Sequence, residues 1–160
     1  MPVTRRRPSA LRVAVVDGRG RPVHAPGLAK WLEGVAPARA AGRVTVAMVA
    51  DPRMRALNRT YRGKDAVTDV LSFPAAAAPV ADGGGRFLGD IVIASGRART
   101  QARAAGHAES VEWRVLALHG LLHVIGYDHE TDNGAMARVE TRLRRAGGLE
   151  RGLIERSPAR

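Results

Sequence analysis

Two histidines lie four residues apart in a stretch of the sequence that is otherwise almost wholly apolar. From residue 115 to residue 125, every residue except Gly120 and the two histidines, His119 and His123, is apolar. Such a run predicts a helix that is buried nearly all round. Side chains at positions i and i+4 share one face of a helix, so both imidazoles are placed to bind one ion. The spacing therefore predicts a metal site.

A third histidine follows the predicted helix. Gly126 is expected to end the helix, because glycine adopts the left-handed conformation of a C-cap without a steric penalty. The chain then turns back, so that His129 can reach the same ion. Three neutral imidazoles leave a fourth position open for water, an arrangement that suits Zn2+, and we expect one ion per chain. Nickel or copper could occupy the same ligands.

Three other interpretations of these histidines remain open. The histidines could be core residues satisfied by hydrogen bonds. The spacing H-x-x-x-H-x-x-G-x-x-H is also that of the metzincin metallopeptidases, in which a glutamate after the first histidine is the general base. Gly120 occupies that position here, so a peptidase would lack its usual proton acceptor. Finally, a fourth protein ligand in place of water would indicate a purely structural zinc in a binding protein without catalysis.

Several motifs of this sequence resemble those of the YbeY family of bacterial metal-dependent endoribonucleases and rRNA maturation factors. The family pattern H-G-x-L-H-x-x-G-Y-D-H is matched at every fixed position from His119 to His129. A second pattern, close to N-x-x-Y-R-x-K-x-x-P-T-D-V-L-S-F, is matched within residues 57–74, except that Val67 stands where proline is common. An L-G-D-I block is matched at residues 88–91.

This resemblance covers about residues 44–147 and implies both a fold and a function. It implies a zincin-like fold and a zinc-dependent endoribonuclease that is specific for single strands. The implied roles are maturation of the three-prime end of small-subunit ribosomal RNA and ribosome quality control. The expected partners are accordingly single-stranded RNA, ribosomal RNA and the small ribosomal subunit.

Three further residues are candidates for the chemistry. The resemblance places the family's functional arginine at Arg62, whose guanidinium can grip phosphate oxygens and stabilise a charged transition state. Lys64 could add a phosphate contact, and for both residues a solvated surface position is the alternative. Asp128 is expected to orient a ligand histidine or accept a proton, or else only to bond the backbone of its own turn. Whether water or the RNA 2′-hydroxyl attacks stays open.

The composition restricts the class of protein. The formal charge of +11 favours an anionic partner such as RNA. A GC-rich genome, which encodes arginine frequently, produces the same excess of positive charge. The absence of cysteine excludes disulfides and thiolate metal sites, and a cytoplasmic location is expected. No apolar run approaches the length needed to span a membrane, and the basic N-terminus does not have the pattern of a secretory signal.

The order of elements predicts one α+β domain. Turn residues and hydrophobic periodicity predict strands at residues 11–16, 43–49, 68–73 and 87–93. Helices are expected from residue 26, from Asp51, from Ser95, over residues 115–125 and before Gly147, with Asp51 and Ser95 capping the helices that they begin. We expect a small mixed sheet of about four strands packed against helices, with the histidine helix in the core. Within residues 1–160, the expected domain spans 10–148, with basic tails at 1–9 and 149–160.

Overall fold

The computed structural model describes residues 10–76, 86–128 and 130–149. The elements follow the predicted order of strand, helix, strand, helix, two strands and three helices, which confirms the α+β prediction. Their bounds are β1 (Leu11–Asp17), α1 (Leu28–Val35), β2 (Gly42–Val49), α2 (Asp51–Arg62), β3 (Val70–Pro74), β4 (Phe87–Ala94), α3 (Ser95–Ala105), α4 (Glu109–Val124) and α5 (Ala135–Ala146).

The four strands form one mixed sheet in the order β1-β2-β4-β3. Strands β1, β2 and β4 run parallel, and β3 pairs antiparallel with β4 at the edge of the sheet. Alternate residues of β2, such as Val44 and Val46, are buried, whereas Arg43 between β1 and β4 is exposed. The two faces of the sheet therefore have different surroundings. The prediction of a small mixed sheet is confirmed, and the zincin-like comparison stays a prediction.

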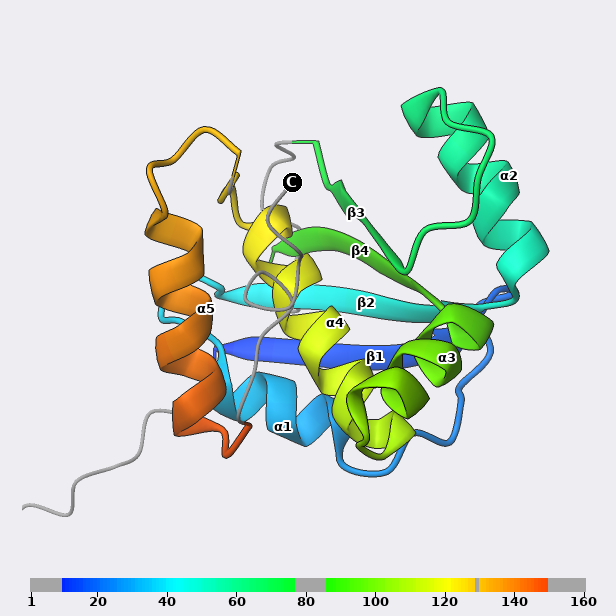
Figure 1. Cartoon of the computed structure of the whole chain (residues 1–160). Coiled ribbons are helices and arrows are strands. Elements are labelled where there is room, and N and C mark those ends of the chain that lie inside the picture. Colours follow the sequence, from blue (N-terminus) through cyan, green and yellow to red (C-terminus); the bar gives the residue numbers. More distant parts are fainter. Residues whose placement is uncertain (1–9, 77–85, 129, 150–160) are drawn as a thin grey trace, which may run out of the picture.

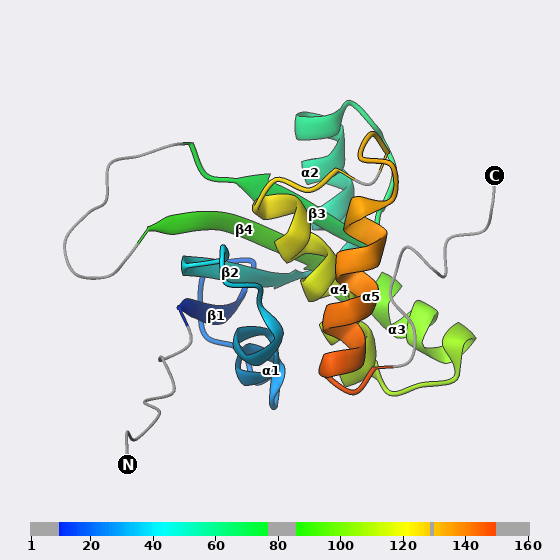
Figure 2. The ribbon, with the colours of Figure 1, turned by 90° about the vertical axis from the view of Figure 1, so that its left-hand side faces the viewer.

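Helices α1 and α4 cover one face of the sheet, α3 packs beside α4, and α5 packs on α4 and α1 (Figures 1 and 2). The side chains between these helices and the sheet form the larger hydrophobic cluster of the described residues. Helix α2 lies against the opposite face at one end, where Met54 is fully buried with Val49, Leu71 and Val92. No other helix of the described residues lies on that second face (Figure 1).

Helix α4 is the central helix of the covered layer. Every residue from Val115 to Leu122 is buried, as the apolar run predicted. The helix begins earlier than residue 115, at Glu109, because residues 109–114 include no glycine or proline and continue the helix ahead of the apolar run. The expectation that the histidine helix lies in the core is therefore confirmed.

The described residues contain no helix that is both long enough and apolar enough to cross a membrane. The predicted tails, residues 1–9 and 149–160, lie outside the described residues except for Leu149. Leu149, which the sequence assigned to the C-terminal tail, is buried, and its carbonyl oxygen accepts a hydrogen bond from Arg144 at 3.1 Å. The packed structure therefore includes Leu149.

The prediction that Asp51 and Ser95 cap the helices that they begin is wrong. The N-cap residues of α2 and α3 are Ala50 and Ala94, and neither makes a side-chain cap. Instead, the carboxylate of Asp51 accepts hydrogen bonds from the backbone N–H groups of Gly96 at 3.1 Å and Arg97 at 3.2 Å. Strands β2 and β4 are parallel neighbours, so the helices that follow them begin side by side. Asp51 thus caps α3 from the first turn of α2.

This cross-helix cap predicts a measurable loss of stability on substitution. We expect Asp51→Ala to lower the free energy of unfolding by about 1 kcal/mol, because two N–H groups of α3 lose their acceptor. Urea denaturation measures this change. Asp65→Ala is the matched control: its carboxylate pairs with Arg55 in an exposed salt bridge, so the variant should stay close to wild type. Equal stabilities for the two variants would contradict the cap.

Candidate metal centre

The two helical histidines are neighbours in space as well as in sequence. The ring centroids of His119 and His123 are 4.8 Å apart, and their planes are inclined at 74°. His119 is 7% exposed and His123 is half-buried. Two imidazoles on one tetrahedral ion have centroids about 5 Å apart, given metal–nitrogen bonds of about 2.1 Å. The observed pair fits this spacing.

Both imidazoles are held through the same ring nitrogen. The Nδ1 atom of His119 lies 2.9 Å from Oε2 of Glu140, a buried carboxylate on α5. The Nδ1 atom of His123 lies 2.9 Å from the carbonyl oxygen of Tyr127. A neutral imidazole that donates from Nδ1 presents the lone pair of Nε2 to a ligand. This donor set fits a metal, because carboxylate and carbonyl partners are the usual supports of metal-binding histidines.

The turn after α4 supplies the carbonyl that holds His123. Gly126 has a φ of 106°, as its predicted capping role requires. Its N–H donates to the carbonyl of His123, and the N–H of Tyr127 donates to that of Leu122, both at 3.0 Å. This is the hydrogen-bond pattern of a Schellman motif. The guanidinium of Arg39 lies 4.2 Å from the centre of the Tyr127 ring and covers the turn.

The third predicted ligand, His129, lies outside the described residues. Within the ranges that the structure describes, no group of three or more histidine, cysteine, aspartate or glutamate side chains is placed to hold a metal. A metal site at His119 and His123 therefore needs His129 or solvent to complete it. The assignment of His129 stays a prediction.

Arg62 and the two histidines line one pocket of about 410 Å3. Arg62 is the last residue of α2, and its Nη2 donates to the carbonyl oxygen of Ser72 at 2.7 Å. Its guanidinium also lies 5.5 Å from the centre of the Phe73 ring. Strand β3 thus fixes the arginine across the pocket from α4. Lys64 is exposed and is not among the residues that line this pocket.

Two aspartates near the pocket have different surroundings. Asp128 is exposed, and its Oδ1 accepts a hydrogen bond from the backbone N–H of Glu130 at 3.1 Å, which is the turn-bonding alternative. Asp69 lines the pocket, and its Oδ2 accepts a hydrogen bond from Gln101 at 3.1 Å. Neither contact tests a role for Asp128 in proton transfer.

Gly120, between the two histidines, lies directly against the sheet. A Cβ atom at this position would be 2.5 Å from Cγ2 of Ile91 on β4, which is too close for any side chain without a shift. The carbonyl oxygen of Gly120 also accepts a hydrogen bond from Oγ of Ser72 at 3.0 Å. The position that carries the peptidase glutamate therefore has no room for one here.

Sequence reasoning missed Glu140 as a functional residue. It is 2% exposed and lies on α5, 21 positions after the histidine that it contacts. A signal for it was present: Met136, Val139 and Leu143 form the apolar stripe of this helix, and Glu140 is a charged residue within that stripe. A carboxylate that faces a core needs a partner.

The fold and the site together define a small α+β protein with paired helical histidines and an arginine in one pocket. The family model of Endoribonuclease YbeY matches residues 27–146. The chain belongs to this family, which confirms the resemblance inferred from its motifs.

Curated relatives and one solved structure agree with this membership. Endoribonuclease YbeY of Solibacter usitatus is 52% identical over 106 residues, which are 66% of this chain and 67% of the relative. That of Nitratiruptor sp. is 45% identical over 114 residues, 71% of this chain and 76% of the relative. The solution structure of a Thermotoga maritima protein matches with a TM-score of 0.54 at 24% identity, covering 82% of this chain and 85% of that one. This last likeness shows the fold alone.

The packing of Gly120 predicts opposite effects for two glycine substitutions. We expect Gly120→Ala to lower the free energy of unfolding by about 1 kcal/mol or more, because the new methyl group overlaps Ile91. Gly34→Ala, in α1, should instead raise it by about 0.5 kcal/mol, because its Cβ would meet no atom within 4 Å. Thermal denaturation of both variants measures the difference. A stabilised Gly120→Ala protein would show that α4 does not approach the sheet this closely.

The contact between Glu140 and His119 predicts a loss of metal affinity when the carboxylate is neutralised. We expect Glu140→Gln to weaken Zn2+ binding about tenfold, the lower end of the range for such supporting residues. Competition with a chromophoric chelator measures the affinity. Glu109→Gln, at a surface ion pair with Arg99, is the matched control and should bind as wild type does. Unchanged affinity in Glu140→Gln would exclude a supporting role.

Proposed function

We propose that this protein is a metal-dependent endoribonuclease that cleaves single-stranded RNA. The relatives in its family carry the name endoribonuclease. The observation that carries the proposal is the single pocket that His119 and His123 line together with Arg62, beside strand β3. Metal ligands and a fixed guanidinium are the groups that a phosphodiester hydrolase needs.

The metal is proposed to be one Zn2+ ion per chain, held by His119, His123 and His129. Support comes from the engaged Nδ1 atoms and from the 4.8 Å separation of the first two rings. Three neutral imidazoles with one open position are a typical catalytic zinc set. When bound, the ion supplies a Lewis acid that polarises a phosphate oxygen and lowers the pKa of a water molecule.

Arg62 is proposed to bind the scissile phosphate and to stabilise the charge that develops on it. The guanidinium of Arg62 has five N–H groups, and one of them donates to the carbonyl oxygen of Ser72. The other N–H groups can donate to phosphate oxygens. The Phe73 ring and the Ser72 carbonyl fix the plane of the guanidinium before substrate arrives, which removes part of the entropic cost of ordering it.

Two residues have proposed accessory roles. Lys64 is proposed to contact a phosphate outside the pocket, since the cationic loop that carries it follows α2 directly. Asp128 is proposed to orient a ligand histidine or to take a proton during the reaction, beside its contact with the turn. A peptidase activity is disfavoured, because Gly120 leaves no space for the glutamate that peptide hydrolysis requires.

The cellular role proposed for the chain follows from the family resemblance. It comprises maturation of the three-prime end of small-subunit ribosomal RNA and ribosome quality control in the cytoplasm, with ribosomal RNA and the small ribosomal subunit as partners. The catalytic domain is proposed to span residues 10–148, together with Leu149, which packs with it. The formal charge of +11 supports binding to RNA phosphates.

Cleavage of a fluorescent single-stranded RNA by the zinc-loaded protein tests the proposal. We expect a chelator or His119→Ala to abolish cleavage. Arg62→Ala should lower kcat about 100-fold, in the range measured for the loss of one transition-state donor. Arg59→Ala, which removes an exposed arginine from the same helix, should leave kcat near wild type.

The same reaction has outcomes that contradict the proposal and that resolve the nucleophile. Cleavage that survives His119→Ala and Arg62→Ala together would assign the activity to another site or to a contaminant. Among the products, a terminal cyclic phosphate would indicate attack by the 2′-hydroxyl, and a five-prime phosphate would indicate attack by water.

A further inference from the structure

Over most of its area, the second face of the sheet has no helix against it among the described residues. Parallel strands are normally covered by helices on both faces, yet in the described part of the chain β1, β2 and β4 carry only α2, at one end of this face (Figure 1). Arg12 and Arg43 pair across β1 and β2, and both side chains are exposed. Among the described residues, the two exposed large hydrophobic side chains, Tyr61 and Phe87, both border this face. We name it the open face.

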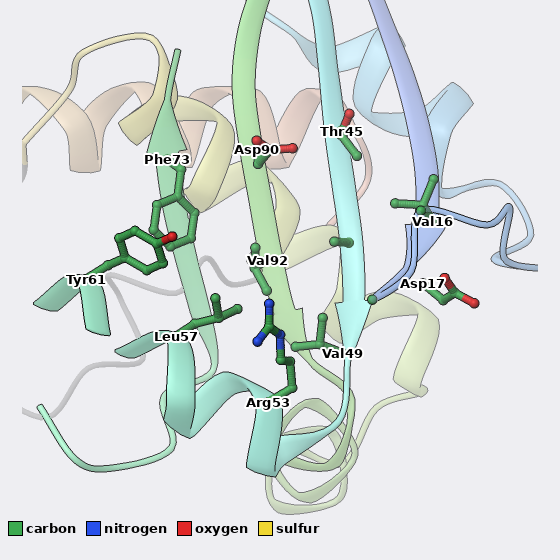
Figure 3. Close-up of a pocket in the computed structure, with 13 residues that line it drawn as sticks. Val16, Asp17, Thr45, Val49, Arg53, Leu57, Tyr61, Phe73, Asp90 and Val92 are labelled. Atoms are coloured by element: carbon green, nitrogen blue, oxygen red, sulfur yellow. The ribbon is translucent and has the colours of Figure 1, made fainter. Parts of the chain in front are cut away.

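A pocket of about 470 Å3 lies on the open face beside α2 (Figure 3). Tyr61 and Phe73 form one wall, with their ring centroids 5.3 Å apart in an edge-to-face arrangement. Thr45 and Asp90, which are register partners on β2 and β4, place a hydroxyl and a carboxyl along the sheet. Arg53 reaches from α2 toward Val92 (Figure 3). The volume is in the range of sites for small molecules and single nucleotides.

These groups match the chemistry of an unpaired nucleobase. Bases of single-stranded RNA stack on aromatic rings and on guanidinium planes, and Tyr61 is 60% exposed. A carboxyl group accepts hydrogen bonds from exocyclic amino groups on base edges, which gives Asp90 a partner. Partial burial raises the pKa of Asp90, because desolvation disfavours its charged form, and a hydrogen bond from a base amino group would offset that cost.

The charge of the open face favours RNA over a basic protein segment. Three arginines are exposed on this face: Arg53 lines the pocket beside α2, and Arg12 and Arg43 line a smaller pocket that includes Phe87. The carboxyl groups that line these pockets are those of Asp17 and Asp90. The carboxylate of Asp17 is already engaged by its own turn, where it accepts bonds from two backbone N–H groups and pairs with an arginine at 3.2 Å. The remaining balance is positive, as a phosphate backbone requires.

The open-face pocket and the histidine pocket meet at the edge strand β3. Consecutive residues of α2 line the two pockets: Tyr61 the open-face pocket and Arg62 the histidine pocket. On β3, Ser72 lines the histidine pocket and Phe73 lines the other, because successive side chains of a strand point to opposite faces. One RNA strand that crosses the edge of β3 would therefore contact both pockets.

We propose that the open-face pocket is a second RNA subsite, which binds an unpaired base of the strand whose phosphate is held at Arg62. This inference rests on the proposed endoribonuclease function. It assigns Tyr61 to stacking, Arg53 to a phosphate or to the face of the base, and Asp90 to the edge of the base.

Steady-state cleavage of a 12-nucleotide single-stranded RNA by the zinc-loaded protein tests the subsite. We expect Tyr61→Leu to raise KM about fivefold or more, the lower limit for the loss of one stacked base, with kcat within about twofold of wild type. Tyr61→Phe keeps the ring and should restore the wild-type KM. Arg53→Gln should raise KM, and Arg59→Gln, an equal loss of charge outside the pocket on the same helix, should raise it clearly less.

The outcomes separate this inference from the proposed function. If the wild-type protein cleaves RNA and Tyr61→Leu and Arg53→Gln have wild-type KM values, the subsite is wrong and the endoribonuclease function stands. If the wild-type protein does not cleave RNA, both fail. If a labelled basic peptide binds the wild-type protein, binds Tyr61→Leu more weakly, and KM for RNA is unchanged in that variant, the open face belongs to a protein partner instead.

Discussion

The close approach of helix α4 to the sheet at Gly120 is the constraint on which the rest of the site depends. With no side chain at this position, the backbone of the helix lies against Ile91, and its carbonyl is within reach of Ser72. The histidines that lie one position before and three positions after the glycine are therefore held at the edge of the sheet. A bulkier residue would move both imidazoles away from Arg62.

Hydrogen bonds from two different elements then fix the imidazoles. Glu140 reaches His119 from α5, and the Tyr127 carbonyl reaches His123 from the Schellman turn. A buried carboxylate is costly to desolvate, so the burial of Glu140 is consistent with a role in positioning His119. The candidate centre thus depends on packing between α4, which carries both histidines, α5 and the turn, and α5 and the turn contribute one hydrogen bond each.

Local patterns in the sequence predicted most of the fold and only part of the site. The buried helix, its glycine cap and the order of elements are encoded within short windows, where periodicity and turn chemistry act. Glu140 and the cross-helix cap at Asp51 depend on which elements become neighbours, and spacing along the chain carries little information about that. The position of Arg62 opposite the histidines is likewise a tertiary result of α2 leading into β3. The family motifs pointed to that arginine, and the fold supplies the physical reason.

Three imidazoles are proposed to hold one ion and to leave it open to substrate. X-ray absorption spectroscopy at the zinc edge of the loaded protein measures this coordination directly. We expect three imidazole nitrogens and one oxygen at about 2.0–2.1 Å from the ion, with one imidazole lost in His129→Ala. A spectrum with four protein ligands, or one that His129→Ala leaves unchanged, would contradict it.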